Sequence, residues 1–266
     1  QNRFNDRVQE GSDRAGGLLQ QIKNIAVAVG GLAATKKILG LSDTLASTKA
    51  RLNLIVDDGG SVNELEKKIM ASAQRSRASY LSAAQAVSQM GLMAADAFSS
   101  NDELIAFTET LNKQFVIAGA NAAGAEAATL QLTQAMASGV LRGEELNSVF
   151  EQAPNVIQSI ADYLGVSIGE IRGMAAEGQI TADIVKNAMF AAADDVNAKF
   201  SSMPMTWGQV FTMASNVALQ VLQPLLNGIN WLANNISIIG PLVLGLGAAF
   251  AVFQIAAHWK IGRAHV

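Results

Sequence analysis

Residues 143–165 read GEELNSVFEQAPNVIQSIADYLG, and this stretch decides the fold class. Pro154 lies inside it, and a proline removes a backbone donor and clashes with the preceding helical turn. The stretch therefore predicts two helices, or one sharply kinked helix, with the change at Pro154. The apolar residues recur every three or four positions, which is the spacing of one helix face: Leu146, Val149, Phe150, Ala153, Ile157, Ile160 and Leu164.

Further helices are predicted on both sides of this stretch. A serine followed three positions later by a glutamate is a capping box, which marks a helix start. An Ala-rich segment, 121–138, ends at Gly139, and residues 57–60 (Asp-Asp-Gly-Gly) indicate a turn. Apolar residues at every fourth position from 180 to 200 predict one continuous amphipathic helix. The capping boxes are Ser61–Glu64, Ser100–Glu103 and Ser167–Glu170.

The character of the chain changes after Pro204. A helical apolar stripe starts at Trp207, and Pro224 is expected to kink that helix. Residues 236–257 then contain no charged residue, and 22 residues of helix span roughly 33 Å, which matches a bilayer core. We therefore expect a membrane-length helix from Ile236 to Ala257, with packing inside a helical assembly as the alternative.

The fold class predicted from these patterns is all-α, because no segment alternates with a period of two. We expect a helical segment over 1–40, a compact multi-helix domain over 41–203, and a long kinked amphipathic helix followed by the hydrophobic helix over 204–259. The last seven residues, 260–266, resemble a translated sequencing adapter, so we expect the natural protein to continue past Trp259.

Composition argues against most catalytic and metal sites. The chain has no cysteine, which excludes a thiolate nucleophile or a thiolate metal site. Its only histidines are His258 and His265, so neither a serine–histidine–aspartate triad nor a zinc site is expected. We expect no cofactor. The net charge of −3 also argues against a DNA-binding surface.

Two local patterns have both a functional and a structural interpretation. Glu144, Glu145 and Glu151 could form the carboxylate pair of a peptidoglycan muramidase. The structural interpretation, in which the first two glutamates favour the positive end of a helix that starts after Gly143, is preferred.

Residues 164–172 are similar to the turn of a helix-turn-helix. Four acidic residues against two basic ones give residues 155–189 a net charge of −2, so a helical hairpin is preferred to a DNA reader.

From about Leu41 to Trp207, the chain resembles the N-terminal domain family of phage tail tape measure proteins. Shorter blocks lie at 42–53, 73–76, 97–104, 112–119, 177–182 and 205–207. The most specific block is QLTQAMASGVLRGEELN, residues 131–147, which continues to Pro154. The motif residues within it are Gln131, Leu132, Gln134, Ser138, Gly139, Leu141, Arg142, Gly143, Glu145, Leu146 and Pro154.

The resemblance implies a non-enzymatic scaffold for tail tube assembly and length control, with a role in genome ejection. The implied partners are other copies of the chain, the tail tube protein, tail assembly chaperones, tail-tip proteins and, at ejection, the host membrane. The implied location is the virion tail, with the host inner membrane as a site reached on infection. The alternative is a membrane-active pore or DNA-delivery protein.

A helix rises 1.5 Å per residue, so an extended helical chain can act as a ruler. The 266 residues of this sequence contain too little extended helix to be the ruler itself.

Overall fold

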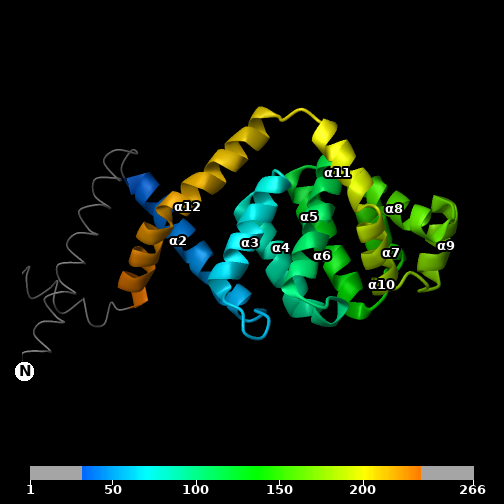
Figure 1. Ribbon diagram of the computed structural model, residues 1–266, viewed down its shortest axis with the longest axis horizontal. Coiled ribbons are helices and arrows are strands. Elements are labelled where there is room, and N and C mark those ends of the chain that lie inside the picture. Colours follow the sequence, from blue (N-terminus) through cyan, green and yellow to red (C-terminus); the bar gives the residue numbers. More distant parts are fainter. Residues whose placement is uncertain (1–31, 235–266) are drawn as a thin grey trace, which may run out of the picture. The chain divides into compact units, whose positions relative to one another are not determined.

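The computed structural model describes residues 32–234, and these residues are helical nearly throughout (Figure 1). Within this range the extended structure amounts to one isolated antiparallel bridge, between Val140 and Thr181. The all-α class is therefore confirmed. The helices are α2 Leu32–Asn53, α3 Val62–Arg75, α4 Tyr80–Met93, the 3-10 turn η1 Ala95–Ala97, α5 Asn101–Ala118, α6 Ala122–Ser138, α7 Gly143–Gln152, α8 Pro154–Leu164, α9 Ile168–Ala176, α10 Ala182–Ala191, α11 Ala193–Ser202 and α12 Trp207–Asn234.

Contacts divide the chain into two compact units. One unit is Ser47–Val221, and the other combines Gln1–Ala46 with Leu222–Val266. In the second unit the hydroxyl of Ser42 donates a hydrogen bond to the carbonyl of Leu226 at 3.1 Å. The boundaries predicted at 41 and 203 stay a prediction.

The unit Ser47–Val221 is built around helix α5. In its first half α3 and α4 pack on each other and on α5, and α6 packs on α4; helices α7 to α11 form its second half (Figure 1). The apolar face of α5 lies inside, with Leu104, Phe107, Leu111 and Phe115 all buried. Such burial removes each side chain from water and is worth about 1.5–3 kcal/mol per residue.

Pro154 acts as the sequence predicts. Helix α7 ends at Gln152, and Pro154 is the first residue of α8, where its missing N–H costs no hydrogen bond. The apolar stripe continues across this break, because Val149, Ala153 and Ile157 are all completely buried. The prediction of two helices is confirmed.

The three predicted capping boxes differ in completeness. The box between Ser167 and Glu170 is complete at the start of α9. At α3 and α5 only the serine half is present, and Glu103 accepts its hydrogen bonds from Ser99 instead of Ser100. The Ala-rich helix begins after Asn121 and ends at Gly139, as predicted.

The prediction of one continuous helix from 180 to 200 is wrong. The chain forms α10 and α11, with a break at Ala192, and Ile180 lies ahead of the Thr181 cap. The two helices pack on different partners, α10 mainly on α8 and α11 mainly on α5. A straight helix could not follow both, so tertiary packing overrides the local periodicity.

Helix α12 starts with a capping box that the sequence analysis missed. The N–H of Thr206 donates to Oε1 of Gln209 at 3.1 Å, and the N–H of Gln209 donates to the Thr206 hydroxyl at 3.3 Å. Pro224 lies inside α12, and the kink expected there stays a prediction. The segment from Ile236 to Ala257 lies outside the described residues. Within 32–234 no helix combines the length and the apolarity that crossing a membrane requires.

Candidate functional site

The motif block 131–154 forms the connection between α6, α7 and α8. Gly139 ends α6 with a φ of 83°, a left-handed conformation that favours glycine. Beyond it, the N–H of Leu141 donates to the carbonyl of Ile180 at 2.7 Å, and the N–H of Ala182 donates to the carbonyl of Gly139 at 2.9 Å. The block thus ties the end of α6 to the start of α10, which is distant in sequence.

The side chains of the motif are divided between the core and the surface. Those of Leu132, Leu141 and Leu146 are buried, and the Ser138 hydroxyl donates to the carbonyl of Val140 at 3.0 Å. The motif therefore stabilises a turn and a core layer. The remaining members are half-buried (Gln131, Gly143, Glu145) or exposed (Gln134, Ser138, Gly139, Arg142, Pro154).

The three glutamates considered for muramidase chemistry lie on α7. Glu144 and Glu151 are exposed, while Glu145 is half-buried and its Oε2 atom has no hydrogen-bond partner among the described residues. None of them lines the groove beside Asn112 and Asn121 or the smaller cavity beside Leu54 and Phe98. The first two occupy the first turn of α7, where the helix dipole favours negative charge.

Helices α8 and α9 form the turn that is similar to a helix-turn-helix. Gly165 ends α8 with a φ of 69°, and α9 buries Ile171 and Ala175 against its neighbours. The guanidinium carbon of Arg172 lies 4.5 Å from the centre of the Phe150 ring. The one basic residue of α9 is therefore engaged within the protein.

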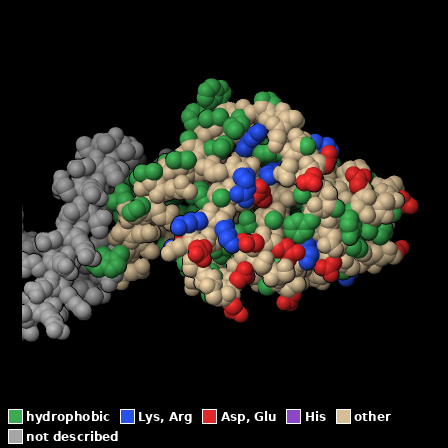
Figure 2. Space-filling view, viewed as in Figure 1, with side chains coloured by type: hydrophobic (Ala, Val, Ile, Leu, Met, Phe, Trp, Pro, Cys, Tyr) green, Lys and Arg blue, Asp and Glu red, His purple; other side chains and the backbone are tan. Residues whose placement is uncertain are grey.

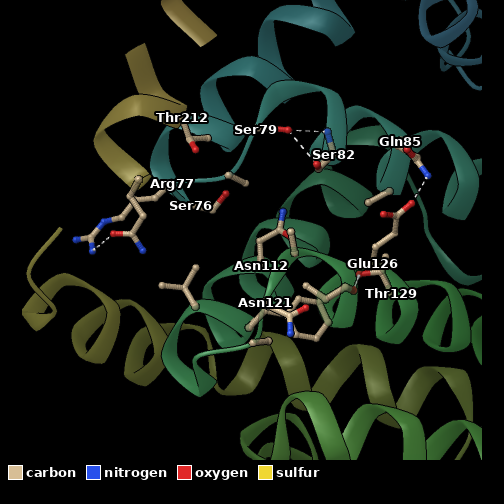
Figure 3. Close-up of a pocket in the computed structure, with 18 of the residues that line it drawn as sticks. Ser76, Arg77, Ser79, Ser82, Gln85, Asn112, Asn121, Glu126, Thr129 and Thr212 are labelled. Atoms are coloured by element: carbon tan, nitrogen blue, oxygen red, sulfur yellow. Dashed lines mark hydrogen bonds between the residues drawn. The ribbon is translucent and has the colours of Figure 1, made fainter. Parts of the chain in front are cut away.

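A groove of about 660 Å³ lies between α4, α5, α6 and the start of α12 (Figure 3). Its lining mixes apolar side chains with hydroxyl and amide side chains, and several of the polar ones bond to one another. The Ser79 hydroxyl donates to Ser82 at 2.9 Å, and Gln85 donates to Glu126 at 3.0 Å across the groove (Figure 3). Such a lining offers hydrogen bonds and no reactive constellation.

Metal coordination finds no support in the described part of the chain. No group of three or more His, Cys, Asp or Glu residues in 32–234 is placed to hold an ion.

A charge cluster joins α3, α5 and α11; its members Glu109 and Lys113 are buried, and Arg75 is exposed. Arg75 donates to Glu109 at 2.6 Å, and Lys113 donates to the same carboxylate at 2.7 Å. Burial alone raises the pKa of Glu109, but the hydrogen bonds and charges of these two cations outweigh it and hold that pKa below its ordinary value. Lys113 also donates to Asn197 of α11 at 2.7 Å, so the cluster fixes α11 on α5.

Helix α12 is attached to the unit Ser47–Val221 through polar contacts. Asn216 is 1% exposed; its carbonyl oxygen accepts from the N–H of Tyr80 at 2.8 Å, and its amide donates to the carbonyl of Ala78 at 2.9 Å. Gln74 donates to the carbonyl of Met213 at 3.2 Å, and Arg77 donates to Oε1 of Gln209 at 3.5 Å. Sequence reasoning missed Asn216, because Gln209, Gln220 and Gln223 lie on the same side of the helix and nothing local distinguishes the buried amide from them.

The apolar stripe of the same segment points away from the unit. Trp207 is 78% exposed, Phe211 68% and Val221 74%. Figure 2 shows hydrophobic side chains gathered at the surface over the start of α12. We call this surface the α12 apolar face; it consists of Trp207, Val210, Phe211, Ala214, Val217, Ala218 and Val221.

Comparison with known proteins gives one match. The model of a protein family described as "Tape measure protein" matches residues 36–225. No curated protein and no solved structure matches the chain. The matched range covers well over half of the chain and includes the whole unit Ser47–Val221.

Proposed function

Because the chain belongs to the tape measure protein family, a family of phage tail components, we propose that it is a structural scaffold in tail tube assembly, with no catalytic role. The observation that carries this proposal is the position of the match. It covers the helical unit in which the motif residues hold a turn and a core layer together.

Within that function, we propose that the unit Ser47–Val221 is a folded head and not the measuring part. Its helices α7 to α11 are each only 9–11 residues long and pack on one another. A ruler needs helix that runs along the tube, because each residue then adds 1.5 Å of length. A chain folded back on itself adds far less.

The partners we propose are other copies of the chain, the tail tube protein, tail assembly chaperones and tail-tip proteins. The exposed helix faces of the unit supply surface for them, and the α12 apolar face is the most hydrophobic of these in the described residues.

Tail length distinguishes a scaffold from a ruler. We would delete residues 47–221 in frame from a phage tape measure gene that carries this sequence and examine the particles by electron microscopy. A scaffold head predicts loss of assembled tails. Complete tails shortened by roughly 260 Å, at 1.5 Å per residue, would instead assign measurement to this unit. Tails of normal length would refute both roles.

A point variant removes the ambiguity of a large deletion. Leu146 is 1% exposed, so Leu146→Asp places a charge in the core and should abolish tails by unfolding the unit. The matched control is Gln134→Asp, an exposed position in the same motif, which should leave tails intact.

We also propose a contribution to genome ejection through residues 236–257. The support is the sequence itself, which has 22 consecutive uncharged residues there, enough to cross a bilayer as a helix. Leu242→Arg should abolish insertion of the chain into liposomes. Unchanged insertion would reject the membrane role and leave the scaffold role standing.

A further inference from the structure

The α12 apolar face has the spacing of a helix-pairing seam. Residues 207, 214 and 221 lie seven apart, as do 210 and 217, and the two sets are three positions apart. This is the a and d pattern by which two helices interlock side chains. Phe211 and Ala218 widen the seam on one side, and Asn216 lies on the opposite side, against Tyr80 and Ala78.

Charge identifies the partner that this seam accepts. Residues 200–259 contain no Asp, Glu, Lys or Arg, so every position of α12 is uncharged. Helices that bind membrane surfaces usually carry Lys or Arg on their polar face, and α12 has none. Protein partners of a different sequence are commonly selected by complementary charge, and α12 has no charge to offer them. An identical uncharged helix meets no repulsion in either orientation.

The area is sufficient for a specific contact. Trp207, Phe211 and Val221 supply most of the exposed area of this face. Val210, which is 39% exposed, and Val217, which is 51% exposed, supply more. With aromatic side chains of 150–250 Å² each, the face offers about 500 Å² per copy. Two copies would bury about 1,000 Å², which reaches the lower limit for specific protein interfaces.

We propose that the α12 apolar face pairs with the same face of a second copy of this chain. This face is then the surface through which the self-association proposed above takes place. The biological role of the pairing rests on that proposed function. Residue 214 is midway between 207 and 221, so it lies near its counterpart whether the two helices run parallel or antiparallel.

The absence of cysteine from the chain allows a site-selective test. Ala214→Cys in the full chain should form a disulfide-linked dimer under mild oxidation, seen on a non-reducing gel. Ser215→Cys is the matched control, since it is exposed on the same helix but about 100° around it. We expect Ala214→Cys to cross-link at least tenfold faster. Equal rates would overturn the proposal, even if the chain is oligomeric through residues outside 32–234.

A second variant tests whether the face itself drives the pairing. Adding Val217→Lys to Ala214→Cys should slow cross-linking at least tenfold, because it places like charges across the seam. Leu54→Lys, at a residue 71% exposed and outside the face, should have no effect. Two other outcomes would overturn the proposal.

One is cross-linking that Val217→Lys does not change. The other is a result in which Val217→Lys abolishes binding to phosphatidylcholine vesicles while Ala214→Cys and Ser215→Cys cross-link at equal rates. The face would then bind lipid and not a second copy of the chain. Each of these results leaves the scaffold function testable, because that function is judged by tail assembly in the phage.

Discussion

Replacing Asn216 by alanine should loosen the start of α12 from the rest of its unit. The side chain is 1% exposed and satisfies two backbone groups, the N–H of Tyr80 and the carbonyl of Ala78. A buried polar group that loses its partner costs about 1–3 kcal/mol, so two such groups predict a loss of about 2–6 kcal/mol of docking free energy.

Amide hydrogen exchange of peptides covering 207–221 measures this loss directly. An undocked helix of this length is marginally stable alone, so its amides should exchange whenever it detaches. The predicted loss corresponds to a decrease in protection of about 30- to 20,000-fold, at tenfold per 1.4 kcal/mol. The control is Gln220→Ala, at an exposed position of α12, which should change the docking free energy by less than about 0.5 kcal/mol.

The reasoning would be refuted by unchanged protection of 207–221 in Asn216→Ala. It would also be refuted if protection of buried α5 fell by the same factor, because the amide would then stabilise the whole unit instead of the docking of one helix.

Further variants test the motif turn, the buried charges and the absence of catalysis. Gly139→Ala should lower the free energy of unfolding in urea by about 1–2 kcal/mol because φ is 83° there, whereas Gly143→Ala, with no atom near the added methyl, should be tolerated. The lowered pKa of Glu109 stabilises the fold above the unfolded-state pKa, close to its ordinary 4.5, and this contribution is lost as pH falls through the lower folded-state value. Glu109→Gln should therefore make unfolding less dependent on pH below about 5, and an unchanged acid transition would contradict this. The purified chain should release no soluble fragments from peptidoglycan; release that disappears in a Glu144→Gln, Glu145→Gln double variant would establish a muramidase.

The features that could be predicted from the sequence are those set by nearby residues. Pro154 divides two helices because its own ring forbids the interior position, and Gly139 ends a helix because its backbone tolerates a positive φ. The complete capping box at Ser167 needs only residues within four positions. These effects act locally, so the local sequence contains the information.

Features that depend on distant partners could not be predicted. The break at Ala192 arises because α10 packs mainly on α8 whereas α11 packs mainly on α5, although the apolar spacing runs through it unchanged. The inward face of α12 is likewise set by Tyr80 and Ala78, more than a hundred residues away, so the apolar stripe after Trp207 gave no indication that it faces outward.

The polar docking of α12 has a thermodynamic consequence. Releasing residues 207–221 would exchange the hydrogen bonds of Asn216, of Gln74 to Met213 and of Arg77 to Gln209 for bonds to water, while the α12 apolar face is already exposed. Heat capacity and denaturant dependence both scale with newly exposed surface, so both should be small for this step. The enthalpy of docking should then be nearly the same at all temperatures, and a partner that binds the helix can shift the docking equilibrium without competing against the hydrophobic core.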